Sequence, residues 1–361
     1  MRRVRYAQWV LMLAAWLALV GLGLRPALGQ EHYRLQDQTG WQKQPEPAPN
    51  TPAGQIQTIR KAMAEGRFTD AYNLADAWIK AHPNNPLLVE AYLLRGDAQS
   101  GYHDYYNALY DYEYVIRAYP GSEQFNTALQ REFQIARLYS HGVRRKFLGM
   151  PIITCYSEAE EILIRIQERA PGSQIGERAS LELGEHYLRM GEIHNAATAF
   201  DMFLVNYPHS PRREYVMLRL IQTDLAIFKG PQFDATGLLN AAERIKMYQK
   251  EYPASAQKMD ATGILNRIDE SLARREYLTA QWYAQTGEKV SAIYMYRRVV
   301  RDHPRSTAAR DALAVLNRLH LPVQDPDWAA APAATRPSLQ IKLPETLPAN
   351  GAPAGQGGGE P

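Results

Sequence analysis

Histidine, cysteine and carboxylate side chains are the groups that could do chemistry in this chain of 361 residues. Its nine histidines are scattered, and the stretch GEHYLRMGEIH, with His186 and His194, lacks the HExxH order that holds zinc beside a general base. The sequence has no phosphate-binding glycine loop and no G-x-S-x-G elbow. Carboxylate pairs such as Glu160 and Glu161 fall on expected helices, where a solvated face explains them. We therefore predict no catalytic residue, no cofactor and no metal site.

Cys155 is the single cysteine, so the chain cannot form an internal disulfide and its stability must come from packing. A free cysteine is commonly buried as a small apolar side chain. We expect that role for Cys155, near the start of a helix; the alternative is a reactive thiol.

Tyrosine and arginine are the better candidates for binding. The chain has 22 tyrosines, and several of them cluster between residues 102 and 114. Because tyrosine joins an apolar ring to a polar hydroxyl, it suits both half-buried helix contacts and peptide grooves. We expect most tyrosines to pack between helices and some to line a groove. Arginine pairs such as Arg274-Arg275 are most often solvated charge.

A repeated motif marks the junctions between the helices that position these side chains, and one copy of it is YPHSP at 207–211. Its proline recurs six times, each time twelve residues after an alanine: Ala71 and Pro83, Ala108 and Pro120, Ala159 and Pro171, Ala196 and Pro208, Ala241 and Pro253, Ala292 and Pro304. Between these pairs, apolar residues recur at intervals of three and four, which indicates amphipathic helices.

The physics of the motif predicts helical hairpins. A small alanine lets two antiparallel helices approach closely, and proline, with no N–H and a fixed φ, cannot continue a helix. Two residues after each proline stands a side chain that can cap the next helix: Asn85, Ser122, Ser173, Ser210, Ser255 and Ser306. The segment 183–208 fits the tetratricopeptide pattern L-G-x2-Y…A-x3-F…P.

We therefore predict an all-α tetratricopeptide-repeat (TPR) α-solenoid of about six hairpins over residues 55–320, with a capping helix from Thr307 to Leu319. Successive alanines lie 37 to 51 residues apart, against about 34 for an uninterrupted repeat. The extra residues are expected in the insertions 140–155 and 228–237 and in a long helix through 267–285. Such insertions are often binding loops, although a packing role explains them equally well.

Both ends of the chain differ from the repeats. Residues 1–29 combine early arginines, an apolar run and a small-residue cleavage site, which predicts a secretory signal peptide; the alternative is an uncleaved membrane anchor. Removing this leader, with four arginines and no acidic residue, takes the formal charge from +3 to −1, so we expect no nucleic-acid partner. Residues 30–54 and 321–361 are rich in proline and small or polar residues and are predicted to be a disordered linker and a disordered tail.

An exported array of this kind resembles the BamD (YfiO) family, the periplasmic TPR component of the outer-membrane β-barrel assembly machinery. The resemblance is clearest in REYVM at 213–217 and in LARREYLTAQWYAQTGEKVSAIYMYRRVVRDHPRSTAARDAL at 272–313. It implies a non-enzymatic scaffold in the periplasm, associated with the outer membrane of a Gram-negative-type bacterium. Its implied partners are unfolded outer-membrane proteins and the barrel-inserting outer-membrane subunit.

The resemblance also implies site residues. It places a peptide groove at Tyr92, Asp97, Tyr102 and Tyr106, and partner docking at Arg274, Arg275 and Glu276. The sequence departs from the family because no lipid-bearing cysteine follows the leader and because a proline-rich tail follows Pro322. Membrane association would then depend on a partner or on an uncleaved N-terminal segment.

Two other functions remain open on the sequence. A TPR adaptor of the Tol-Pal-associated type, coordinating cell-wall synthesis with outer-membrane constriction, would keep the fold and change the partner. A helical-repeat enzyme acting on the cell wall would need a catalytic lobe, and the repeats leave no stretch of chain that could form one.

Overall fold

The computed structural model describes residues 33–36, 40–43, 47–147 and 150–323, and the chain divides into two compact units at Met190 and Gly191. Unit 1 contains α2 (Pro52–Ala64), α3 (Phe68–Ala81), α4 (Leu88–Gly101), α5 (Tyr105–Ala118), α6 (Glu123–Ser140), α7 (Tyr156–Arg169) and α8 (Gln174–Met190). Unit 2 contains α9 (Ile193–Asn206), α10 (Arg213–Ile227), α11 (Thr236–Glu251), α12 (Pro253–Lys258), α13 (Ala261–Gln285), α14 (Lys289–Asp302) and α15 (Thr307–Arg318). The predicted all-α TPR fold is confirmed.

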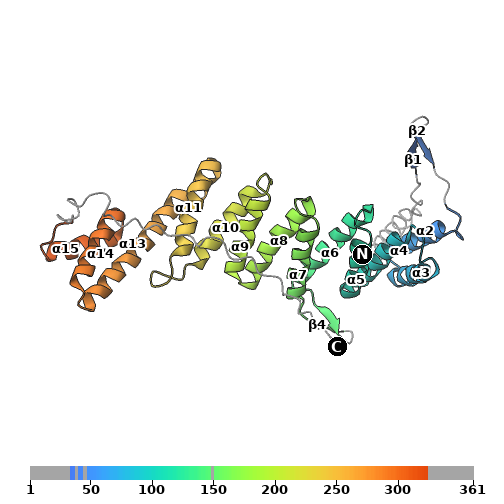
Figure 1. Cartoon of the computed structure of the whole chain (residues 1–361), viewed down its shortest axis with the longest axis horizontal. Coiled ribbons are helices and arrows are strands. Elements are labelled where there is room, and N and C mark those ends of the chain that lie inside the picture. Colours follow the sequence, from blue (N-terminus) through green and yellow to red (C-terminus); the bar gives the residue numbers. More distant parts are fainter. Residues whose placement is uncertain (1–32, 37–39, 44–46, 148–149, 324–361) are drawn as a thin grey trace, which may run out of the picture. The chain divides into compact units, whose positions relative to one another are not determined.

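In unit 1, consecutive helices form hairpins in chain order (Figure 1). Helix α2 packs on α3, α4 on α5, and α6 on α7, and α8 packs against α7 and α6. The tight turn between α2 and α3 holds Gly66 at a φ of 73°, a left-handed conformation that glycine adopts without steric strain because it has no Cβ. The boundary between the units falls in the turn predicted for the fourth hairpin, so α8 belongs to unit 1 and α9 to unit 2.

In unit 2, α9 packs on α10, α10 on α11, and α13 on α14. The short helix α12 joins α11 to α13 and contacts both. The predicted long helix is α13, which has 25 residues. Helix α15 packs against α13 and α14, as predicted for a cap.

The alanine and proline positions lie where the motif predicts. All six alanines are at most 3% exposed, which leaves room only for close helix contacts. Five of the prolines lie in the non-helical connection between one helix and the next, directly after its C-cap residue; the exception is Pro253. Cys155 is buried immediately before α7, as predicted for a small apolar residue.

The predicted caps are confirmed for most copies of the motif. The Ser122 and Ser306 hydroxyls accept the backbone N–H groups of the third residue on, at 3.1 and 2.9 Å. Ser173 makes the same bond, whereas Asn85 and Ser210 accept an N–H two residues on, just ahead of their helices.

The predicted cap at Ser255 is wrong. Pro253 begins α12, because its fixed φ fits the first turn of a helix, and Ser255 therefore lies inside that helix. Helix α13 is capped instead by Asp260, whose side chain accepts the Gly263 N–H at 3.1 Å.

Two short antiparallel hairpins were not predicted. Strands β1 (Tyr33–Gln36) and β2 (Gly40–Lys43) fall in the segment predicted as a disordered linker, and α2 begins at Pro52, inside the same segment. Apolar and polar residues alternate in YRLQ, as strands require, but the run is too short to stand out. Strands β3 (Arg145–Phe147) and β4 (Met150–Ile153) occupy the 140–155 insertion, whereas the insertion before α11 forms a loop.

The predicted signal peptide at 1–29 and nearly all of the predicted tail at 321–361 lie outside the described residues. Within the part of the chain that the structure does describe, no helix has the length and apolar character needed to cross a bilayer.

Candidate protein-binding site

Two of the residues predicted to line a peptide groove, Tyr92 and Tyr102, pack between helices of unit 1. The Tyr92 ring lies against Tyr114 of α5, with centroids 4.0 Å apart. Tyr102, which ends α4, meets Tyr72 of α3 edge-on with centroids 6.2 Å apart. Burial raises the pKa of Tyr102 to about 12, which keeps its hydroxyl protonated. These two tyrosines hold α4 against its neighbours.

Tyr106, the third predicted groove residue, lies on α5 against the β3–β4 hairpin. The Arg145 guanidinium sits over its ring, 4.0 Å from the centroid, a geometry that gives a cation–π attraction. The Tyr110 hydroxyl donates a hydrogen bond to the Tyr106 hydroxyl at 2.8 Å. Tyr106 therefore supports the base of the hairpin.

Asp97 is the predicted groove residue that lines a cavity. Its carboxylate accepts hydrogen bonds from the Tyr112 hydroxyl at 2.8 Å and from the Arg131 guanidinium at 2.8 and 3.2 Å. The cavity has a volume of about 310 Å³ and is lined by residues of α2, α4, α5 and α6. Around the ion pair its wall is largely apolar or small, with Met63, Ser100, Gly101, Ile135 and Leu138.

The α6 wall of this cavity was missed on the sequence. Arg131, Gln134, Ile135 and Leu138 follow one another at intervals of three, one and three residues and so share one face of the helix. That spacing was visible, but it resembles any amphipathic stripe. Only the structure, in which Arg131 pairs with Asp97, 34 residues away, shows that this face lines the cavity.

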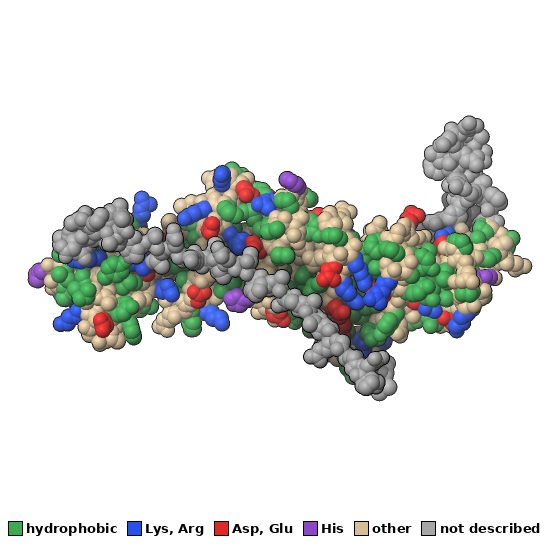
Figure 2. Space-filling model, in the orientation of Figure 1, with side chains coloured by type: hydrophobic (Ala, Val, Ile, Leu, Met, Phe, Trp, Pro, Cys, Tyr) green, Lys and Arg blue, Asp and Glu red, His purple; other side chains and the backbone are tan. Residues whose placement is uncertain are grey.

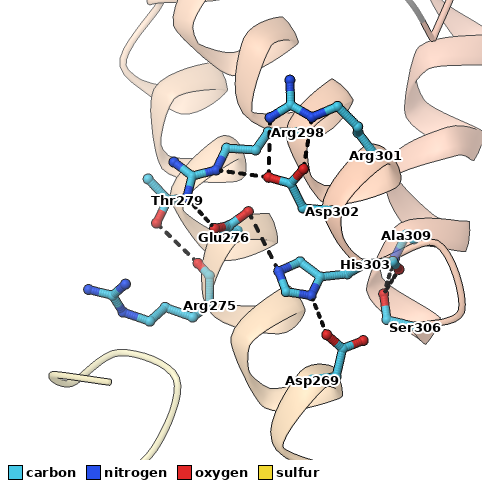
Figure 3. Close-up of polar contacts among 10 residues, drawn as sticks. All are labelled: Asp269, Arg275, Glu276, Thr279, Arg298, Arg301, Asp302, His303, Ser306 and Ala309. Carbon is cyan, nitrogen blue, oxygen red and sulfur yellow. Dashed lines mark hydrogen bonds and ion pairs between the residues drawn. The ribbon is translucent and has the colours of Figure 1, made fainter. Parts of the chain in front are cut away.

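The three residues predicted to dock a partner lie on α13 but do not form one surface. Glu276 faces α14, is 15% exposed, and its Oε1 lies 2.8 Å from an Arg298 nitrogen. Arg274 lies over the Tyr277 ring, 5.2 Å from its centroid, and 3.5 Å from the Asp311 carboxylate. Arg275 is exposed, and Figure 3 shows its guanidinium directed away from Glu276.

Glu276 belongs to a chain of charges that joins α13 to α14 (Figure 3). His303 Nδ1 lies 2.6 Å from Asp269, and its Nε2 lies 4.0 Å from Glu276. Arg301 binds Asp302 at 2.8 and 3.2 Å, and this hydrogen bonding lowers the pKa of the Asp302 carboxyl. His303 is the histidine of the HPRS motif, so this copy of the repeat signal also carries a helix-to-helix clamp.

Charged side chains are used in the same way in unit 1. Arg169 of α7 makes a two-point bond to Glu113 of α5 at 2.6 and 2.7 Å. Figure 2 shows basic side chains beside acidic ones over α5 and α6, and hydrophobic ones over α3 and α4, on the face drawn. His186 is buried and shares a 3.0 Å hydrogen bond with Ser140, whereas His194 is exposed.

The described residues offer no arrangement of three or more His, Cys, Asp or Glu side chains that could hold a metal ion. The lining of the cavity, an ion pair beside apolar and small side chains, offers a surface for polar and apolar contacts. Its ion pair can meet backbone amides and carbonyls, and its apolar wall can meet a side chain.

Comparison with known proteins finds a family match that covers unit 2 and the end of unit 1. The family described as YfiO, outer membrane lipoprotein, matches residues 154–332. The outer membrane protein assembly factor BamD of Caulobacter vibrioides is 21% identical over 203 residues, which cover 56% of this chain and 65% of that protein. BamD of Pasteurella multocida is 24% identical over 191 residues, covering 50% of this chain and 73% of its own length.

Among solved structures, a tetratricopeptide repeat protein from Parabacteroides merdae is similar with a TM-score of 0.34 and 14% identity, over 73% of this chain and 97% of its own. The match to the Caulobacter relative spans just under two thirds of that relative's length. The matched segment begins just before α7 and includes the helices α7 to α15. On the family match and these relatives, residues 154–332 of the chain belong to the BamD (YfiO) family.

Proposed function

We propose that this protein is a non-catalytic scaffold of the periplasm that serves outer-membrane protein assembly. In this proposal, the unit 1 cavity binds extended segments of unfolded outer-membrane proteins, and the exposed part of α13 docks a protein partner. The relatives are named as assembly factors for outer membrane proteins, which supports this process over others. The observation that carries the proposal is the cavity around Asp97 and Arg131.

The composition of the cavity supports a peptide ligand. An unfolded barrel segment has unpaired backbone N–H and C=O groups and alternating apolar side chains. The Asp97 carboxylate can accept hydrogen bonds from the backbone N–H groups of such a segment, and the Arg131 guanidinium can donate to its C=O groups. Met63 and Leu138 offer apolar surface beside them, and the volume of about 310 Å³ suits a side chain or two rather than a folded partner.

The docking site is proposed on Arg275 rather than on all three predicted residues. Glu276 and Arg274 already interact with neighbouring charges of the same unit. Arg275 is exposed, and the side chain carries five N–H donors that match a carboxylate in two-point geometry. An acidic patch on the partner would therefore meet Arg275 first.

Peptide binding is tested by changing the cavity wall without changing the core. Leu138 is 37% exposed and lines the cavity, so Leu138→Glu places a charge on the apolar wall. Leu74, 40% exposed on α3, lies outside the cavity, and Leu74→Glu is the matched control. Fluorescence anisotropy with peptides from outer-membrane β-strands should show affinity lowered about tenfold by Leu138→Glu alone. Equal affinities for both variants would exclude the cavity as the binding site.

Partner docking is tested by charge reversal on one helix. Arg275→Glu is compared with Arg267→Glu, which changes another exposed arginine of α13. Pulldown from detergent-solubilised envelopes should recover the barrel-inserting subunit with the wild type and with Arg267→Glu, but not with Arg275→Glu. Recovery of cell-wall synthases in place of that subunit would favour the adaptor function and overturn the proposal.

A further inference from the structure

The β3–β4 hairpin exposes apolar side chains on a short element that extends from the helices of unit 1 (Figure 1). Met150 is 57% exposed and Ile152 is 51% exposed, and Pro151 between them is exposed as well. Single exposed apolar residues are ordinary on a protein surface. Three in succession on an extending hairpin leave apolar surface in water that the fold itself does not cover.

Positive charge accompanies this apolar surface. Arg144 comes directly before β3, and Arg145 and Lys146 are its first two residues. Arg144 and Lys146 are exposed. Within the described part of the chain, no carboxylate forms an ion pair with any of the three. The hairpin thus combines exposed apolar side chains with cations that no described carboxylate neutralises.

The base of the hairpin is held in place, so its outer residues have a fixed direction. Arg145 lies over the Tyr106 ring at 4.0 Å, and the Lys146 ammonium is 3.4 Å from the carbonyl oxygen of Tyr102. The chain then returns to the helices at Cys155, which is buried. These contacts tie the hairpin to α4, α5 and α7 of unit 1.

Addition of a client strand to the hairpin edge is disfavoured. Strand β3 has three residues, and β4 contains Pro151, which has no N–H to donate. Short, charged, proline-containing strands are the features that block pairing at a sheet edge. The hairpin is therefore poorly suited to a partner that binds through backbone hydrogen bonds.

An anionic bilayer surface needs no such hydrogen bonds. Interfacial elements insert apolar side chains at the boundary of headgroups and acyl chains and place Lys and Arg among acidic headgroups. We propose that the β3–β4 hairpin is a membrane-contact element that binds an anionic phospholipid surface through Met150 and Ile152, with Arg144 and Lys146 at the headgroups. This attachment is independent of the peptide-binding and docking sites proposed above.

A local probe tests the proposal on the full chain. Met150→Cys provides an exposed thiol for an environment-sensitive fluorophore, because Cys155, the native cysteine, is buried. Leu239→Cys on α11, where the leucine is 52% exposed, is the matched control site. With phosphatidylglycerol-containing vesicles, the emission at position 150 should shift to the blue, while position 239 and pure phosphatidylcholine vesicles should give no shift.

The charge requirement is tested on the same labelled protein. Arg144→Gln with Lys146→Gln should weaken the hairpin's partition onto anionic vesicles about tenfold or more and reduce its salt dependence. Thermal unfolding should be unchanged by Arg144→Gln alone, because Arg144 is exposed and is not one of the residues that hold the base of the hairpin. No blue shift at position 150, an equal shift at position 239, or an equal shift on neutral vesicles would overturn the proposal. So would loss of outer-membrane peptide binding by the Gln variants without any change in vesicle binding.

Discussion

Replacing Glu132 with glutamine tests whether a buried carboxylate destabilises unit 1 at neutral pH. Glu132 lies on α6, is 1% exposed, and its Oε2 has no hydrogen-bond partner among the described residues. Burial raises its pKa to about 7, although Arg169, 3.6 Å away, and Arg165 favour the ionised form, and Glu113 adds to the rise. Burial is the largest of these effects, so desolvation decides the direction.

The magnitude follows from proton linkage. A tenfold change in proton affinity corresponds to about 1.4 kcal/mol, so a pKa raised from 4.5 to about 7 means that ionised Glu132 costs the folded state about 3 kcal/mol. Because the folded pKa is raised, the stabilising contribution is complete below about pH 4.5 and is lost as pH rises through about 7. Glu132→Gln cannot ionise, so it should not lose this contribution.

The assay compares wild type and Glu132→Gln at pH 5 and pH 8 by hydrogen exchange of the α6 backbone amides, which reports on unit 1 by itself. Between these two pH values, the wild type should lose about 2–3 kcal/mol of protection relative to the variant. Glu161→Gln on α7, which removes an exposed carboxylate, should follow the wild type. Parallel pH profiles for wild type and Glu132→Gln would refute the reasoning.

Two further substitutions address the packing of α4 on α5. Arg95→Met removes the cation that lies 2.6 Å from buried Asp111, and an uncompensated buried carboxylate should destabilise unit 1 by about 3–5 kcal/mol, measured by urea denaturation followed at the α4 and α5 amides. Gly96→Ala would place a Cβ 2.7 Å from a Tyr112 ring carbon, and because that ring is held by its hydroxyl, we expect a loss of about 1–3 kcal/mol in the same assay. Gly121→Ala meets no atom within 4 Å and should leave the urea midpoint unchanged.

The repeat architecture could be predicted because its signals are local. Alanine at a helix contact and proline after a helix act within a few residues, so the six pairs located the hairpins before any contact was known. Pro253 shows the limit of such signals. Proline excludes the interior of a helix but fits its first turn, so the same residue that ends one helix can begin another.

The candidate site could be predicted only in part, because it depends on how helices face one another. Consecutive helical residues point about 100° apart, so Arg274, Arg275 and Glu276 leave α13 in different directions, and Glu276 faces α14. The same geometry separates Tyr92 from Asp97, five residues apart on α4. Arg131 could not be found from the sequence, since its partner Asp97 is distant in the chain and their contact depends on the packing of α6 on α4.

The division between structural and binding roles follows burial rather than residue type. Arg298 and Arg275 are both arginines of the last hairpin, yet Arg298 binds Glu276 at 2.8 Å while Arg275 is exposed. Arg298 therefore has little to offer an acidic partner surface, because recruiting its charge would leave the half-buried Glu276 without its cation. A search for partner contacts should therefore begin with cations that no carboxylate of the described fold neutralises, and by this criterion Arg275 and Arg144 come before the clamp residues.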